Sequence, residues 1–174
     1  MNATTDVKRA FLRHAVATLA YRGGKVVRDA PDNFPSFRVG ETTRTPSQIL
    51  SHVGDLLDWA LSLATGNEKW NDATPLPWEQ EVARFYSALN TLDACLASDA
   101  ALGRPCEQIF QGPIADALAH VGQLAMLRRL AGQPVRGENY GTAEIEIGRV
   151  GPQQSAKRME FDRENATGGI VFLG

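Results

Sequence analysis

Two histidines and one aspartate have the types and spacing that metal chemistry requires. Asp116 and His120 are four residues apart in a helical pattern, which places their side chains on one helix face, one turn from each other. His52 lies inside the apolar stripe of an earlier predicted helix. Metal sites in helical bundles are built from inward-facing side chains on facing helices, so these three residues are predicted to hold one divalent ion. Two imidazoles and one carboxylate leave coordination positions open, which is typical of a reactive ion.

Each of these patterns also has an ordinary structural interpretation. An Asp-x-x-x-His pair is common on solvated helix faces, and a carboxylate near a helix N-terminus is favoured by the helix dipole. A single histidine in an apolar stripe is often a neutral core residue that makes a hydrogen bond. His14 is expected on the inner side of the first helix, near Phe11 and Thr18, where packing is favoured over a role as a further ligand.

Apolar residues at helical spacing predict four helices, and no strand pattern of comparable strength accompanies them. The second helix has the clearest start. Thr45 caps it, Pro46 suits the first helical position, and Gln48 completes a T-x-x-Q capping box. The first helix is expected at about 6–21, with Gly23-Gly24 ending it, and the second at 46–65, before Gly66. The third is expected at 77–99. The fourth is expected at 112–132, where Gly112-Pro113 begins it and Gly132 ends it.

Length and composition favour one globular domain, and the four predicted helices without a strand pattern make it an all-α four-helix bundle. The chain has 174 residues, of which 43% are hydrophobic and 22% charged, both ordinary for a globular protein. The bundle is assigned to residues 1–140 and a C-terminal extension to residues 141–174. Within the extension, 143–150 is expected to form a short helix, and the apolar run 170–173 to pack on the bundle or on a second subunit.

Charge and hydropathy argue against several classes of partner. The 18 basic and 20 acidic residues give a net charge of -2, and no basic run could follow a phosphate backbone, so nucleic acid is not expected as a partner. Neither a signal peptide nor a membrane-spanning apolar run is recognisable, so a cytoplasmic location without membrane contact is expected. Cys95 and Cys106 lack CxxC spacing and are taken as ordinary residues.

The site residues lie in two segments that resemble a known family. The run G-P-I-A-D-A-L-A-H-V-G-Q-L-A-M-L-R-R-L-A-G from Gly112 and the segment T-P-S-Q-I-L-S-H from Thr45 are similar to the fourth and second helices of the DinB/YfiT-like superfamily of metalloenzymes. The resemblance implies one metal-binding histidine at His52 and another at His120, ahead of Gly122-Gln123. The family pattern has a third histidine where this chain has Asp116.

The resemblance also implies an up-down-down-up topology, in which a connection crosses the bundle between the second and third helices. Residues 66–76 span about 36 Å when extended, against about 30 Å for a twenty-residue helix, so they can just make that crossing. Asp116 is a harder ligand than histidine, which shifts the expected ion from zinc or nickel toward iron or manganese without excluding zinc. A homodimer is implied as well.

The expected reaction involves a small-molecule substrate, and its class stays open at this point. A water on the ion could serve a hydrolase or isomerase, and a bound low-molecular-weight thiol, the cofactor of related enzymes, could serve an S-transferase or isomerase. Gln123 is expected to orient a bound ligand or cofactor, and Arg128 and Arg129 either meet a carboxylate or only complement the helix dipole. The alternative is a non-catalytic ligand-binding or interaction bundle with a structural or lost metal site.

Overall fold

The computed structural model describes residues 3–161, 163–164 and 170–171. Most of these residues are helical, which confirms the predicted all-α class, and the two short strands pair antiparallel with Arg163 opposite Val171. Within the described part of the chain, no helix is both long and apolar enough to cross a membrane. The elements are α1 (Ala3–Val27), α2 (Pro46–Thr65), α3 (Trp78–Ala97), α4 (Cys106–Ile109), the π-helical turn η1 (Phe110–Ile114), α5 (Ala115–Leu130), β1 (Arg163–Glu164) and β2 (Ile170–Val171).

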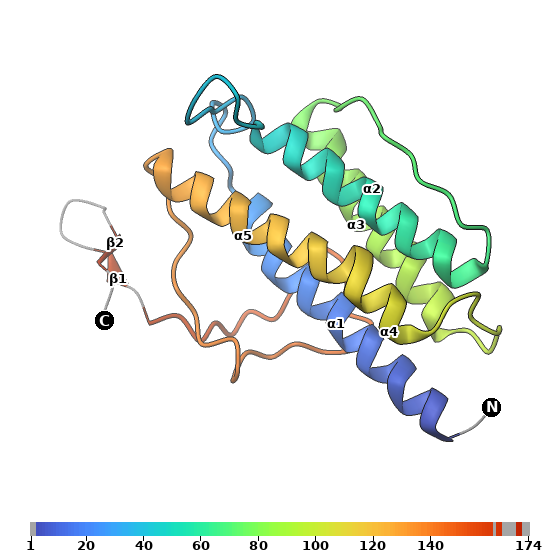
Figure 1. Ribbon diagram of the computed structural model, residues 1–174. Helices are drawn as coiled ribbons and strands as arrows, with labels where there is room; N and C mark the ends of the chain where they lie inside the picture. Colours follow the sequence, from blue (N-terminus) through green and yellow to red (C-terminus); the bar gives the residue numbers. More distant parts are fainter. Residues whose placement is uncertain (1–2, 162, 165–169, 172–174) are drawn as a thin grey trace.

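The long helices pack as a bundle in which α1 and α2 occupy opposite corners. Both α1 and α2 contact α3 and α5, whereas α1 and α2 are not in contact with each other (Figure 1). The connection 66–77 passes along the outside of the bundle from the end of α2 to the start of α3, so these two helices run in the same direction (Figure 1). The α2 and α5 pair carries the predicted metal ligands.

The first helix is predicted by apolar spacing at Val7, Phe11, Ala15, Thr18 and Leu19, and only the second half of this stripe faces the core. Ala15 and Leu19 are buried, whereas Val7 and Phe11 are 70% and 64% exposed. Leu12, the residue after Phe11, is buried in their place. Neighbouring stripes of this helix are both apolar, so periodicity alone could not choose between them.

The prediction that Gly23-Gly24 ends the first helix was also wrong, because α1 continues to Val27. A Cβ atom on Gly23 would lie 2.5 Å from Cζ of Phe85, and one on Gly24 would lie 2.7 Å from the hydroxyl of Tyr86. Both glycines thus allow α1 to approach two aromatic side chains of α3 closely. The local helix-breaking tendency of glycine is overridden by this packing.

The second helix confirms its sequence signals. Thr45 accepts a hydrogen bond from the Gln48 amide N–H, and the Gln48 side chain accepts one from the Thr45 amide N–H, which is the predicted capping box. Gly66 ends the helix in the left-handed conformation, with φ of 77°. The start and end of α2 are therefore set by local chemistry, and this fixes the position of His52 along the helix.

The fourth predicted helix begins earlier than expected. Helical structure starts at Cys106 in α4, and Gly112 and Pro113 lie inside the π-helical turn. Pro113 has no N–H to donate, and within this turn the Ala115 N–H donates to the carbonyl of Phe110, five residues earlier. The chain therefore absorbs the proline in a wider turn instead of starting a helix at it.

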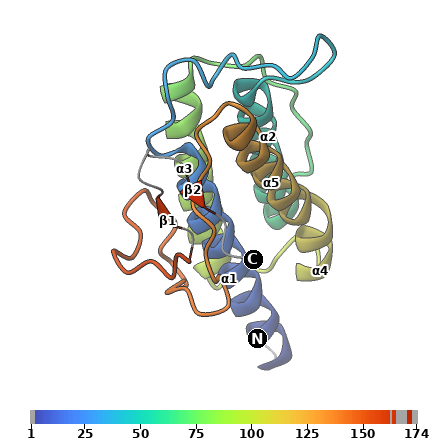
Figure 2. The same cartoon turned by 90° about the vertical axis from the view of Figure 1, so that its left-hand side faces the viewer.

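Residues 137–161 pack beside α1, on the side of the bundle away from α2 (Figure 2). Residues 143–150 contain no helix, so that prediction was wrong, although Val150 is buried in the core. Glu138 fastens this segment to the bundle. Its buried carboxylate accepts hydrogen bonds from Lys25 at 2.7 Å and from the Tyr21 hydroxyl at 2.5 Å. Residues 172 and 173 of the predicted apolar run lie outside the described residues.

Candidate metal centre

The structure brings together the three side chains that were predicted as metal ligands. His52 extends from α2, and Asp116 and His120 extend from adjacent turns of α5. The Nε2 atom of His52 lies 4.0 Å from Oδ2 of Asp116, and the Nε2 atom of His120 lies 3.5 Å from Oδ1 of the same carboxylate. One potential ligand atom from each residue lies within 4.8 Å of the others.

These separations suit a shared ion. Two ligand atoms that each lie about 2.1 Å from a metal are about 3.4 Å apart at a tetrahedral angle and at most about 4.2 Å apart. The two histidine nitrogens lie within this range of the Asp116 carboxylate, each of a different oxygen, whereas the 4.8 Å limit that contains all three ligand atoms is wider than about 4.2 Å, so the side chains move closer together when they share an ion. The three side chains could therefore hold a metal ion.

Gln123 contacts His120 through the ring nitrogen that faces away from the other two residues. Its Oε1 atom lies 2.9 Å from Nδ1 of His120. When Nδ1 carries the proton it donates to this oxygen, and Nε2 keeps its lone pair on the side of Asp116. Gln123, predicted to bind a cofactor, thus lies at the site and holds one of the predicted ligands.

His52 is in an environment that favours its neutral form. Burial lowers the pKa of its imidazole, and the nearby charges of His120 and Arg44 lower it further, against the opposing influence of Asp116 and Asp55. The side chain is still 21% exposed, so it can be reached from solvent. A neutral imidazole is the form that binds a metal ion, and His52 does not need to lose a proton at neutral pH to do so.

Two tryptophans border the site on the side of the 66–77 connection. The ring of Trp70 meets His52 edge to face at a centroid distance of 5.7 Å, and it meets Trp59 at 5.9 Å. Trp59 in turn lies against the π-helical turn, where a Cβ atom on Gly112 would be 3.3 Å from its ring. The aromatic rings therefore link His52 to the segment that precedes Asp116.

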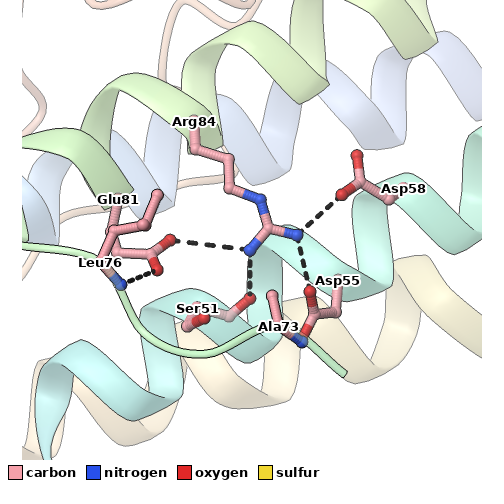
Figure 3. A network of polar contacts seen from close by, with 7 residues as sticks. All are labelled: Ser51, Asp55, Asp58, Ala73, Leu76, Glu81 and Arg84. Atoms are coloured by element: carbon pink, nitrogen blue, oxygen red, sulfur yellow. Dashed lines mark hydrogen bonds and ion pairs between the residues drawn. The ribbon is translucent and has the colours of Figure 1, made fainter. Parts of the chain in front are cut away.

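The connection that carries Trp70 is held in place by a network centred on Arg84 of α3 (Figure 3). The guanidinium binds Asp55 at 2.6 Å and Asp58 at 2.7 Å, both from α2, and it lies 3.8 Å from Glu81. The buried carboxylates of Asp55 and Glu81 also accept hydrogen bonds from the backbone of the 66–77 connection. The backbone N–H of Ala73 donates to Asp55, and that of Leu76 donates to Glu81.

Gly54 leaves the space that this guanidinium occupies. A Cβ atom at position 54 would lie 2.9 Å from Cζ of Arg84. Asp55 and Glu81 have side chains that are only 2% and 0% exposed, so their charges depend on this one cation and on the two backbone donors. Arg84 thus joins α2, α3 and the connection beside His52.

The pocket next to His52 is polar. The apolar residues Phe85 and Leu124 are buried in the core, and Trp59 is partly buried. The pocket has a volume of about 340 Å³ and brings the imidazole together with charged and hydroxyl groups. It is lined by Arg44, Gln48, Ser51, His52, Asp55, Asp72, Ala73, Thr74 and Pro75.

The remaining candidate residues lie away from this centre. His14 is exposed on α1 and does not belong to the group of potential ligands, so its predicted packing was wrong. Arg128 is buried and donates to the carbonyls of Val26, Arg28 and Asp29, which places its guanidinium at the C-terminal end of α1. These hydrogen bonds account for an arginine at this position better than the dipole of its own helix does.

Neither cysteine is near the metal ligands in the fold as described. Cys95 is partly buried, and Cys106 is buried at the start of α4. Burial raises the pKa of the Cys106 thiol, so it stays protonated at neutral pH. Both residues behave as the ordinary side chains that were expected.

Arg44 and the Arg84 network are the groups at this site that sequence reasoning missed. Gln48 and His52 are four residues apart on α2, but Arg44 precedes the capping residue Thr45, so no helical spacing linked Arg44 to His52. Comparison with family models, curated proteins and solved structures gave no match to this chain. The geometry of the site is therefore the basis on which function is inferred.

Proposed function

We propose that the chain is a divalent-metal-binding protein of the DinB type, with His52, Asp116 and His120 as ligands. The observation that carries the proposal is the convergence of three potential ligand atoms within 4.8 Å, from two helices that are distant in sequence. The hydrogen bond from the Nδ1–H of His120 to Oε1 of Gln123 supports it, because metal-binding histidines usually have such a partner on the second ring nitrogen. We also assign the bundle an up-down-down-up topology, supported by the external connection between α2 and α3.

The ligand set admits several ions. Two imidazoles suit zinc, nickel and iron, and the carboxylate of Asp116 adds a harder oxygen ligand that favours manganese and iron. The Asp116 side chain is 51% exposed, so the centre faces solvent and is open to an exogenous ligand. This openness is more typical of a reactive ion than of one that only stabilises the fold.

The proposed reaction is a thiol-dependent transfer or isomerisation, or a hydrolysis, of a small molecule. A divalent ion supplies Lewis acidity to such reactions and stabilises anionic donors, including thiolates. The protein itself keeps His52 neutral through burial, orients the His120 ring through Gln123, and covers one side of the centre with Trp70. The exposed Asp116 side chain and the polar pocket beside His52 leave the centre open to solvent.

Elemental analysis of protein purified without chelators tests the proposal. Wild type is expected to carry, or to take up on reconstitution, one divalent ion per chain, whereas His52→Ala and His120→Ala lose it. The exposed His14 is the matched control, because His14→Ala removes an imidazole outside the site. Wild type without metal after reconstitution would instead support the non-catalytic bundle.

The homodimer and the cytoplasmic location are part of the same proposal. An exposed apolar cluster supports self-association, since Val7 and Phe11 of α1 are mostly exposed and the Phe11 ring lies 6.3 Å from that of Phe110. Light scattering coupled to gel filtration measures the subunit number. Phe11→Ser is expected to shift a dimer toward monomer, and an unchanged mass would place the interface elsewhere.

A further inference from the structure

Arg44 lies between two hollows that flank the metal ligands. It immediately precedes Thr45, the residue that caps α2, and its side chain lines the polar pocket that also contains His52. The same side chain lines a second hollow, of about 600 Å³, between α2 and α5. Arg44 is therefore the cation that borders the centre on both sides.

This guanidinium has no carboxylate partner among the described residues. The partly or fully buried arginines of the bundle are engaged, as Arg13 is with Asp93 and Arg84 is with Asp55. Arg44 is exposed, and its positive charge acts on the imidazole of His52. An exposed cation without a carboxylate partner, beside potential metal ligands, can bind an anionic ligand from solvent.

The second hollow is largely apolar and open. Ile49 of α2 and Met126 of α5 contribute apolar surface, and Gln123, which contacts His120, lies on its wall. Gly122 also lines the hollow, and a Cβ atom at this position would meet nothing within 4 Å. The absence of a side chain at Gly122 leaves room for an apolar group next to the centre.

We propose that Arg44 binds the carboxylate of a small molecule whose second donor atom reaches the metal ion and whose apolar part occupies the hollow over Gly122. This assignment rests on the proposed metal-binding function and names its substrate class, a small amphiphilic carboxylic acid. A guanidinium binds a carboxylate through two parallel hydrogen bonds. The ligand set carries one negative charge, so a divalent ion leaves the centre positive, and Arg44 adds a second positive charge.

The direction of the apolar part follows from the charges in the two hollows. The polar pocket is lined by two carboxylates, Asp55 and Asp72. Asp55 is paired with Arg84, whereas Asp72 is exposed and contributes a negative charge to the pocket. An acidic ligand is repelled on that side. The hollow on the α5 side contains no carboxylate among its lining residues. A ligand held by Arg44 therefore extends toward Gly122.

Two thiols that differ in one carboxylate test this assignment on the cobalt-loaded full-length chain. The probes are 2-sulfanyl-3-phenylpropanoate and 2-phenylethanethiol, whose binding is followed by the sulfur-to-cobalt absorption band. Wild type is expected to bind the carboxylate thiol at least about tenfold more tightly, as a charge-assisted hydrogen-bond pair implies. Arg44→Gln is expected to remove this preference. Arg149→Gln, which removes a surface charge paired with Glu146, is expected to keep it.

Gly122→Leu tests the position of the apolar part, because the new side chain fills open space. It is expected to weaken the binding of both thiols while cobalt stoichiometry and the melting temperature are retained. Equal affinity for the two thiols in wild type, or a preference that survives Arg44→Gln, would overturn the assignment while leaving metal binding intact. Failure of wild type to bind cobalt at all would overturn the proposed function instead, so the two failures are distinguishable.

Discussion

The Nδ1 atom of His120 lies 2.9 Å from Oε1 of Gln123, almost one turn further along α5. This contact leaves the other ring nitrogen 3.5 Å from the Asp116 carboxylate. An imidazole on a half-exposed helix face has several rotamers open to it, and a fixed hydrogen bond selects the one that suits a ligand. The relationship makes Gln123 a positioning residue for the proposed metal centre.

Replacing Gln123 by alanine is predicted to weaken metal affinity about 10- to 100-fold, the usual effect of losing the partner of a metal-binding histidine. Because Gln123 is exposed, the melting temperature of the metal-free protein should not change. Competition with a coloured chelator measures the affinity. Gln123→Glu keeps an acceptor for the ring N–H and serves as the control. Wild-type affinity in Gln123→Ala would show that the ring is oriented by other contacts.

Replacing Arg84 by methionine is predicted to destabilise the protein by about 3–5 kcal/mol, because the buried carboxylates of Asp55 and Glu81 lose their cation. Urea unfolding followed by circular dichroism measures the change. The control is Arg104→Met, which breaks an exposed ion pair with Glu68 and should cost less than about 1 kcal/mol. Equal effects of the two substitutions would contradict the structural role of the network.

Glu138 predicts a specific dependence of stability on pH. Burial alone would raise the pKa of its carboxyl, but hydrogen bonds from Lys25 and Tyr21 outweigh burial, so the pKa lies below its ordinary value. A carboxyl whose pKa is lower in the folded chain than in the unfolded chain stabilises the fold above about pH 4.3, and this stabilisation is lost as the pH falls through the folded pKa.

The corresponding measurement is the free energy of unfolding at pH 7 and in acid. Glu138→Gln is predicted to be less stable than wild type at pH 7, and the difference should shrink as the pH falls below about 4.3. Glu41→Gln alters an exposed side chain and should follow wild type at every pH. A difference for Glu138→Gln that does not vary with pH would show that packing, and not its charge, fastens residues 137–161.

Two helical glycines should respond oppositely to alanine. At Gly23 the new methyl group would lie 2.5 Å from the buried Phe85 ring, so Gly23→Ala is predicted to destabilise by about 1–3 kcal/mol. At Gly122 it meets nothing, and the better helix propensity of alanine should stabilise by about 0.5–1 kcal/mol. Urea unfolding of both variants checks the signs. Stabilisation by Gly23→Ala would contradict the close approach of α1 and α3.

The accuracy of the sequence-based predictions follows the range of the interactions involved. Thr45, Gln48 and Gly66 act on neighbouring backbone groups, so the limits of α2 could be predicted. Gly23 and Pro113 carry local helix-breaking tendencies that tertiary contact and a π-helical turn override. Local signals therefore located helices well and misplaced their ends wherever packing decided them.

The candidate site divides in the same way. Helical spacing alone predicted that Asp116 and His120 share one helix face. The apolar stripe around His52 predicted that its side chain faces the neighbouring helix. Arg84 reaches Asp55 only because Gly54 makes room for it, a relationship between two helices that no spacing within one helix encodes. The grouping of three potential ligands could thus be predicted, whereas the network beside it required the structure.

The central claim, a metal ion shared by α2 and α5, is tested most directly by titrating the metal-free protein with cobalt(II) and following its visible absorption. We predict one saturable site per chain in wild type and in His14→Ala. Affinity should fall at least about 100-fold in His52→Ala, His120→Ala and Asp116→Ala, since each loses one of three ligands. Saturation at one site in all three ligand variants, with unchanged affinity, would contradict the claim.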